Sequence, residues 1–87
     1  MLNKNTISDK IKAVIANNVD KNENIDLKKT FQELGVGSLT FVKILVEIEI
    51  QFSIEIDDCY YTTEYHDIDE FVNKITICLL GEKHYEN

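Results

Sequence analysis

The sequence predicts an all-α fold, a small four-helix bundle with three main helices, a short third helix, and a long loop between helices one and two. Apolar residues recur at helical spacing in three separate segments, strand-like alternation is almost absent, and the chain contains no proline. A chain of 87 residues can bury one hydrophobic core. We therefore expect a single domain over residues 1–87, with its core at about 6–80.

The first helix is expected over about residues 6–18. Asn5 or Thr6 is available as its N-cap, and Asp9 falls in the first turn. Four apolar residues fall on one face and are expected to enter the core: Ile7, Ile11, Val14 and Ile15.

Residues 18–37 then form a connection that is long for so small a domain. So long a loop counts against this assignment of helices unless it has a structural or functional role of its own. Leu27, Phe31 and Leu34 recur at i+4 and i+7 and predict a helical turn that folds the segment back onto the core. Such a turn would hold residues 35–38 at the surface in a fixed position.

The second helix is expected to begin at Ser38 or Leu39 and to end near Phe52, before the turn-prone stretch 53–58. Its core-facing residues lie within about 100° of arc: Phe41, Ile44, Leu45, Ile48 and Phe52. A second apolar stripe lies roughly 145° away, flanked by Lys43 and Glu49: Leu39, Val42, Val46 and Ile50. Periodicity leaves two interpretations open, a central helix buried all round and a docking face for partner proteins.

The last helix is expected to open at Asp67, with Glu70 as its capping-box partner, and to end at Gly81. Its apolar face consists of Ile68, Phe71, Val72, Ile75 and Leu79. Residues 59–65 are expected to form a short helical turn at most, and a strand over 53–56 is the alternative there. Residues 81–87 are predicted to form a frayed polar tail.

Composition narrows the classes of partner. The chain has 16 acidic and 9 basic residues and a net charge of −7, so it would repel nucleic acid and anionic membranes, and a basic protein surface is the favoured partner. No apolar run reaches the roughly 20 residues that a membrane span needs. The two cysteines have no Cys-x-x-Cys spacing and no apolar run follows the N-terminus, so we expect a cytoplasmic protein with reduced thiols.

The hexapeptide Leu34-Gly35-Val36-Gly37-Ser38-Leu39 is the strongest candidate site. It places a serine where a loop ends and a helix begins, so a phosphate ester on the hydroxyl would lie at the positive end of the helix dipole. Gly35 and Gly37 remove side chains on both sides of the approach to Ser38, which leaves room for another protein's active site.

Three other constellations are weaker. Asp20-x-Asn22-x-Asn24 begins like a calcium loop, but Ile25 and Phe31 stand where the glycine and the bidentate glutamate belong. His66 and Glu70 offer too few ligands for a metal site, and helix capping explains the acidic residues better. A hydrolytic triad of Ser38, His66 and an aspartate lacks a substrate cleft and an oxyanion hole. We therefore expect no metal and no catalytic residue.

Several aromatic and sulfur-containing side chains remain. Tyr60, Tyr61 and Tyr65 could line the mouth of an acyl pocket or could simply pack near the short third helix, and the sequence leaves both open. Cys59 and Cys78 are expected to be small core or boundary residues.

The hexapeptide resembles the signature of the acyl and peptidyl carrier proteins, Leu-Gly-x-Asp-Ser-Leu at the head of the second helix. The resemblance continues through 40–44, 47–49 and 52–56 and reaches the start of the last helix at 65–72. The order and spacing of all elements match the carrier pattern.

This resemblance implies that a phosphopantetheinyl transferase moves 4′-phosphopantetheine from coenzyme A onto Ser38. The terminal thiol would then hold an acyl or aminoacyl group as a thioester for a loading enzyme and downstream synthase enzymes, and the carrier, a monomer, would perform no chemistry. Partner enzymes would dock along the second helix, at Leu39, Val42, Lys43, Val46, Glu49 and Ile50.

Two departures from the family pattern matter. Gly37 stands where most carriers have an aspartate that helps to bind the transferase and its metal, although peptidyl carriers commonly have histidine there. Of the acidic positions that fatty-acid carriers show along the second helix, only Glu49 keeps the charge; the others are Thr40, Lys43, Val46 and Ile50. The sequence therefore favours a stand-alone carrier of polyketide, nonribosomal peptide or related specialised biosynthesis. The alternatives are a fatty-acid synthesis carrier and an unmodified helical interaction module.

Overall fold

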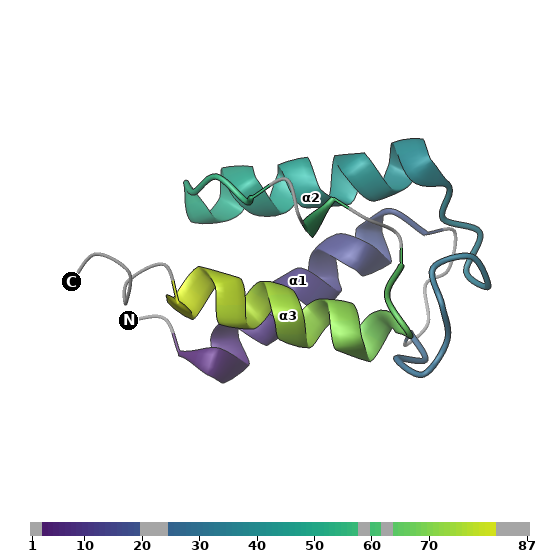
Figure 1. Cartoon of the computed structure of the whole chain (residues 1–87), viewed down its shortest axis with the longest axis horizontal. Coiled ribbons are helices and arrows are strands. Elements are labelled where there is room, and N and C mark those ends of the chain that lie inside the picture. Colours follow the sequence, from purple (N-terminus) through teal and green to yellow (C-terminus); the bar gives the residue numbers. More distant parts are fainter. Residues whose placement is uncertain (1–2, 20–24, 58–59, 62–63, 82–87) are drawn as a thin grey trace.

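The computed structural model describes residues 3–19, 25–57, 60–61 and 64–81. These residues form three α-helices and no strand: α1 (Lys4–Asn17), α2 (Ser38–Phe52) and α3 (Ile68–Gly81). Helix α1 packs against both other helices, and α2 and α3 begin at the same end of the molecule, where residues 25–37 also lie (Figure 1). The all-α prediction is confirmed.

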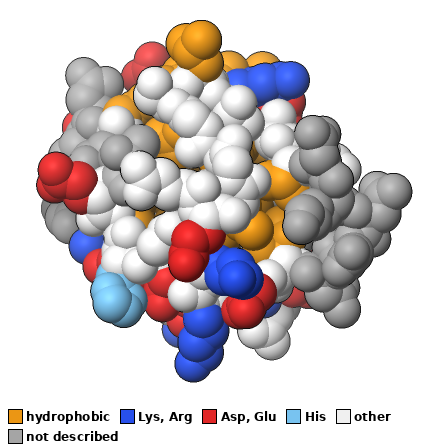
Figure 2. Space-filling view, turned by 90° about the vertical axis from the view of Figure 1, so that its right-hand side faces the viewer, with side chains coloured by type: hydrophobic (Ala, Val, Ile, Leu, Met, Phe, Trp, Pro, Cys, Tyr) orange, Lys and Arg blue, Asp and Glu red, His pale blue; other side chains and the backbone are white. Residues whose placement is uncertain are grey.

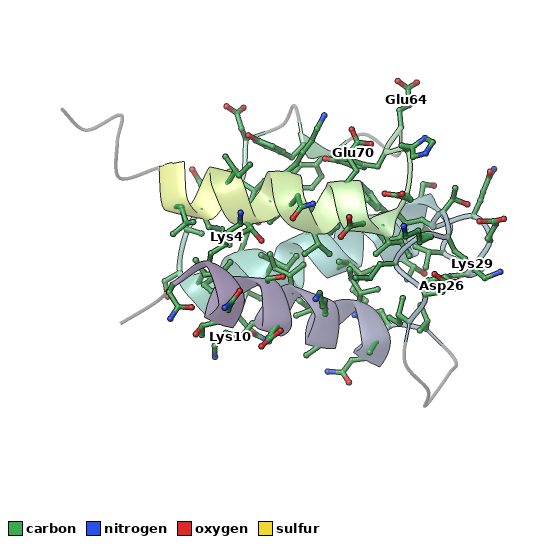
Figure 3. All side chains as sticks on the ribbon, turned by 90° about the horizontal axis from the view of Figure 1, so that it is seen from below. Lys4, Lys10, Asp26, Lys29, Glu64 and Glu70 are labelled. Carbon is green, nitrogen blue, oxygen red and sulfur yellow. The ribbon has the colours of Figure 1, made fainter. Side chains whose placement is uncertain are left out.

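One hydrophobic core joins the three helices. Every predicted core residue of the three helices is buried except Phe52, which is half-buried at the C-terminal end of α2. Phe31, Val36 and Ile56 join the core from the connecting segments. Thr76 is buried as well, and its hydroxyl donates to the Val72 carbonyl at 2.6 Å, so its polar group costs little. Charged side chains lie on the outside of the helices (Figure 3).

Helix α1 begins earlier than predicted. Its N-cap is Asn3, whose Oδ1 accepts a hydrogen bond from the Thr6 backbone N–H at 2.9 Å. The expected caps, Asn5 and Thr6, therefore lie inside the helix, and the helix ends at Asn17 with Asn18 as the C-cap. Three residues with capping side chains stand close together here, and the apolar pattern that begins at Ile7 does not choose between them.

Helix α2 has the bounds that the sequence predicted and ends at Phe52; its C-cap, Ser53, adopts a left-handed conformation with φ 54°. Glu49 then holds the segment that follows. Its carbonyl accepts from the Ile54 N–H at 3.1 Å and its Oε2 accepts from the Ile56 N–H at 2.7 Å. Residues 53–56 therefore form a capping loop, and the alternative of a strand there is wrong.

Helix α3 begins with the predicted pair Asp67 and Glu70, but Glu70 accepts from His66 and not from Asp67. Asp67 Oδ1 accepts from the Glu70 N–H at 2.8 Å, and the Glu70 carboxylate accepts from the His66 backbone N–H, one residue before the N-cap. This hydrogen bond and the nearby Lys74 hold the pKa of Glu70 below its ordinary value. Glu70 also forms an ion pair with Lys74 at 3.3 Å.

The predicted short third helix lies partly outside the described residues; in its described part the Tyr60 N–H donates to the Asp57 carbonyl at 3.0 Å. Residues 58–59 and 62–63, with Cys59, lie outside the described residues, as do the calcium-like segment 20–24 and the tail 82–87. Cys78 is half-buried on α3. No helix in the described part of the chain is long and apolar enough to cross a membrane.

Candidate functional site

A single helical turn leads the chain to Ser38, and its N-terminal side is capped. The Thr30 N–H donates to Glu33 Oε1 at 2.9 Å, and the Glu33 N–H donates to the Thr30 hydroxyl at 3.1 Å. This is a reciprocal capping box. The Thr-x-x-Glu spacing of this capping box is visible in the sequence, but the periodicity of the apolar residues does not show it.

The C-terminal side of the turn is capped by its backbone. The Val36 N–H donates to the Phe31 carbonyl at 2.9 Å, and the Gly35 N–H donates to the Gln32 carbonyl at 3.0 Å. This Schellman arrangement needs a left-handed residue, and Gly35 supplies it with φ 79°. Phe31 and Val36 are both buried, so the hydrophobic contact that accompanies the motif is present.

The same segment is fastened to the start of α3. The Ile68 N–H donates to the Lys29 carbonyl and the Asp69 N–H to the Leu27 carbonyl, both at 2.9 Å. These carbonyls satisfy donors that a helix leaves unpaired in its first turn. The predicted role of residues 27–34 as an anchored turn is therefore confirmed, and the turn also caps α3.

Ser38 is the first residue of α2 and is exposed. Gly37 is the N-cap; its carbonyl accepts from the Phe41 N–H at 2.9 Å, but it has no side chain to cap the helix. The N–H groups of the first turn, those of Leu39 and Thr40 included, therefore have no carbonyl one turn back to bind. An anion at the Ser38 hydroxyl would lie beside these donors and at the positive end of the helix dipole.

The two glycines beside Ser38 differ in their structural need. Gly35 requires its left-handed conformation, whereas Gly37 has an extended backbone with φ −86° and ψ −177° that any residue can adopt. A Cβ atom at either position would meet no atom within 4 Å. The backbone of Gly37 and the space around it would therefore accept the aspartate that most carriers have there.

A pocket of about 300 Å³ adjoins Ser38. Its lining consists of Thr30, Phe31, Gln32, Val36, Gly37, Ser38 and Tyr65. The Tyr65 hydroxyl donates to the Tyr60 carbonyl at 2.9 Å, and its ring packs edge-on against Phe71 with centroids 5.1 Å apart. Of the three tyrosines, Tyr65 thus lines the pocket beside the serine, whereas Tyr60 and Tyr61 pack against the core.

The second stripe of α2 is exposed. The exposed fractions are 87% for Leu39, 71% for Ile50, 41% for Val42 and 39% for Val46. The interpretation of α2 as a helix buried all round is therefore wrong. Figure 2 faces the end where α2 and α3 begin, and hydrophobic side chains protrude there at the top, over α2, beside a basic one. We call Leu39, Val42, Val46 and Ile50 the α2 stripe.

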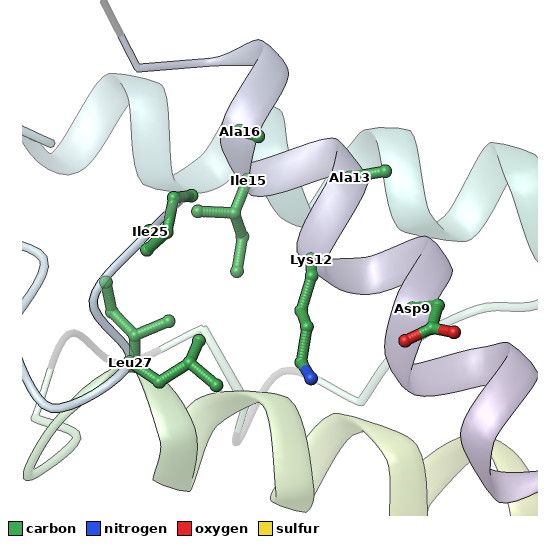
Figure 4. A pocket seen from close by; sticks show the side chains of 8 residues that line it. Asp9, Lys12, Ala13, Ile15, Ala16, Ile25 and Leu27 are labelled. Carbon is green, nitrogen blue, oxygen red and sulfur yellow. The ribbon is translucent and has the colours of Figure 1, made fainter. Parts of the chain in front are cut away.

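A larger pocket of about 480 Å³ lies between α1, residues 25–27 and the start of α3 (Figure 4). Its wall is mostly apolar, and the charged residues Asp9 and Lys12 stand beside it. It shares no lining residue with the pocket beside Ser38, so it is a separate site. Within the described residues no group of three or more metal-binding side chains exists.

The comparison with protein families decides the class of the molecule. The model of the phosphopantetheine attachment site matches residues 9–73, a range that includes most of α1, the anchored turn, α2 and the start of α3. The chain belongs to the phosphopantetheine attachment family. No curated protein sequence matches this carrier domain significantly.

The cofactor of this family is a covalently attached 4′-phosphopantetheine. The residues at the head of α2 fit such a group. Ser38 offers an exposed hydroxyl, the uncapped first turn offers N–H donors for a phosphodiester, and the adjacent pocket offers a surface for an attached chain. The carrier role of the domain follows from this family and this fit.

Proposed function

We propose that Ser38 carries the phosphopantetheine and that the chain is a carrier of acyl or aminoacyl thioesters. One observation supports this most strongly. Ser38 is an exposed serine at an uncapped helix N-terminus, held in place by a turn that is capped on both sides. It also lies at the serine position of the carrier signature.

In this proposal the chain's own residues prepare the serine for a visiting enzyme. The capped turn and the contacts of Phe31 keep the head of α2 in one position, so the transferase meets an ordered target. The Ser38 oxygen would attack the phosphorus of coenzyme A that bears the pantetheine, and its proton would pass to the transferase. The new ester bond would form as the pyrophosphate bond of coenzyme A breaks and adenosine 3′,5′-bisphosphate leaves. The N–H groups of Leu39 and Thr40 would then stabilise the phosphodiester charge.

The carrier itself performs no bond chemistry in this account. It would move a tethered group between enzymes and raise the effective concentration of that group at each of them. A loading enzyme and downstream synthase enzymes would use the α2 stripe together with Lys43 and Glu49, since this face begins one residue after Ser38. We place the carrier in the cytoplasm, as a monomer, because of its acidic charge and its cysteine pattern.

The pathway belongs to the proposal as well. Of the positions along α2 where fatty-acid carriers are acidic, only Glu49 keeps its carboxylate, and that carboxylate is bonded to the Ile56 N–H. This difference supports specialised biosynthesis, of polyketides, nonribosomal peptides or related compounds. In each of these pathways the thiol would carry an acyl or aminoacyl group.

The test is a loading reaction with coenzyme A and a broad-specificity phosphopantetheinyl transferase, followed by intact mass measurement. The unmutated chain and Ser8→Ala, a serine of α1, should gain one phosphopantetheine, and Ser38→Ala should gain none. An unmutated chain that stays unmodified would support the second candidate, an unmodified interaction module. That candidate draws its support from Gly37, which lacks the carboxylate that transferases commonly use.

A further inference from the structure

A basic side chain borders the α2 stripe, although the molecule as a whole is acidic. The chain has a net charge of −7, yet Lys43 is the one charged residue of α2 that is exposed. At about 100° per residue, Lys43 lies about 20° from Ile50 and about 40° from Leu39. An enzyme that covers the stripe therefore covers Lys43 as well.

The two carboxylates of α2 lie at the margins of this face. By the same rotation Glu49 falls about 20° beyond Val42, and Glu47 falls about 40° beyond Lys43 on the other side. Both residues are half-buried, whereas Lys43 is exposed. Lys43 and Glu49 therefore border the α2 stripe on opposite sides, about 20° beyond Ile50 and Val42, and they differ in exposure.

Both carboxylates also bind donors of the chain itself. Glu49 Oε2 accepts from the Ile56 N–H at 2.7 Å, and Glu47 Oε1 accepts from the side-chain amide of Asn18 at 3.1 Å. The Asn18 amide also donates to the Val14 carbonyl at 2.8 Å, which fixes its orientation toward α2. A partner that used either carboxylate would compete with these hydrogen bonds.

Lys43 differs from these two carboxylates because it is exposed and has no ion pair within the described residues. The ion pair recorded there joins Lys74 and Glu70 on α3. Its ammonium group is therefore available to a partner that covers the edge of the α2 stripe beside Ile50 and Leu39. A second cation placed opposite it there would be repelled.

We propose that the enzymes that act on the carrier dock on the α2 stripe through an apolar surface that bears an aspartate or glutamate opposite Lys43. The inference rests on the proposed carrier function and names the chemistry of its partners. The composition alone had favoured a basic partner surface. The net charge of −7 still acts at long range, but salt at about 0.1 M screens charges beyond about 10 Å. At contact the partner therefore meets the exposed Lys43 beside the carboxylates of Glu47 and Glu49, which already bind donors of the chain.

The test measures kcat/KM for loading by a broad-specificity phosphopantetheinyl transferase, at about 50 and about 300 mM salt. Lys43→Glu should lower kcat/KM by about 3- to 10-fold, because it replaces attraction by repulsion at contact. Lys10→Glu is the matched control: it changes the net charge equally, but on the exposed side of α1. It should change kcat/KM by less than about twofold, and salt should change the rate of the unmutated chain by a similarly small factor.

Each outcome decides one proposal. If the unmutated chain gains no phosphopantetheine, the carrier function fails and the docking inference falls with it. If loading occurs but Lys43→Glu is loaded as fast as the unmutated chain or faster, the acidic-partner inference is overturned and the carrier function stands. Circular dichroism of both variants confirms that each is folded before the rates are compared.

Discussion

Gly37 lacks a side chain that could cap α2, and it also lacks the carboxylate that transferases commonly use. It is the N-cap of α2 but offers no side chain to the first-turn donors, and a Cβ there would meet open space. Gly37→Asp should add a capping hydrogen bond and a favourable charge at the helix N-terminus. We expect about 0.5–1 kcal/mol of added stability, measured by urea unfolding, and faster phosphopantetheine loading.

Gly37→Asn separates the two effects. Asparagine caps a helix about as well as aspartate but has no charge, so it should give most of the stability gain and little of the gain in loading. If both variants were loaded equally fast, the carboxylate would have no role in transferase binding. If neither variant raised stability, the N–H groups in the first turn of α2 would already bind another acceptor.

At the scale of single residues the sequence predicted the features that depend on local chemistry. Ser38 at the start of a helix and the turn around Phe31 followed from spacing alone. The N-cap at Asn3 did not, because Asn3, Asn5 and Thr6 all have capping side chains and the choice depends on where the backbone first turns helical.

At the scale of the helix, α2 has a buried face and an exposed one. Ile48 is fully buried, whereas Ile50 is 71% exposed. Ile50→Gln should change the free energy of unfolding by less than about 0.5 kcal/mol but slow the reactions of partner enzymes. Ile48→Ala should cost about 2–5 kcal/mol because it leaves a cavity. A large loss of stability in Ile50→Gln would show instead that the α2 stripe is part of the core.

The first turn of α3 makes stability depend on pH. The hydrogen bond from the His66 N–H lowers the pKa of Glu70 in the folded chain, so the unfolded chain binds its proton more readily. This contribution is present above the unfolded pKa of about 4.3 and is lost as the pH falls through the lower folded value.

Glu70→Gln is the variant that tests this contribution. It should lower the melting temperature at pH 7, and its difference from the unmutated chain should shrink as the pH falls below about 4. Asp69→Asn, at the exposed neighbouring position, provides the comparison for a general loss of charge. A difference that stays constant over the whole pH range would contradict the assignment.

Periodicity predicted the two faces of α2 and the bounds of that helix, since both depend on the chain itself. It did not predict the partners of its carboxylates. Glu47 meets Asn18 and Glu49 meets Ile56 only because α1 and the capping loop fold against α2. The sequence therefore predicted the position of the stripe, with Glu49 as a flanking charge and a docking residue, but not the hydrogen bond that Glu49 accepts from Ile56.

At the scale of the whole molecule, an aromatic cluster joins the anchored turn to two helices. The Phe31 ring packs edge-on against Phe41 at 5.2 Å and against Phe71 at 5.0 Å between centroids. Phe31→Leu should cost about 1–2 kcal/mol of stability through lost ring contacts. It should also slow loading of Ser38, because the turn that positions the serine would be held less firmly.

Phe52→Leu is the control for this prediction. Phe52 is half-buried at the opposite end of α2 from Ser38, so the same change there should leave the loading rate unaltered. Loading rates that fall equally in both variants would mean that overall stability, and not the anchored turn, controls access to Ser38.

The all-α class was predictable because three apolar helix faces can bury each other in a chain of this length. The anchored connection was predictable because Leu27, Phe31 and Leu34 recur at helical spacing. The fastening of α3 by the Leu27 and Lys29 carbonyls was not, because backbone hydrogen bonds between distant segments leave no trace in residue type. The pocket beside Ser38 likewise depends on bringing Tyr65 to the turn.

The attachment of phosphopantetheine to Ser38 is the central claim. Its most direct test is tandem mass spectrometry of the chain after reaction with coenzyme A and a broad-specificity transferase. The chain has serines at positions 8, 38 and 53. We predict that the phosphopantetheine lies on the fragment that contains Ser38; a modification on Ser8 or Ser53, or an unmodified chain, would contradict the account.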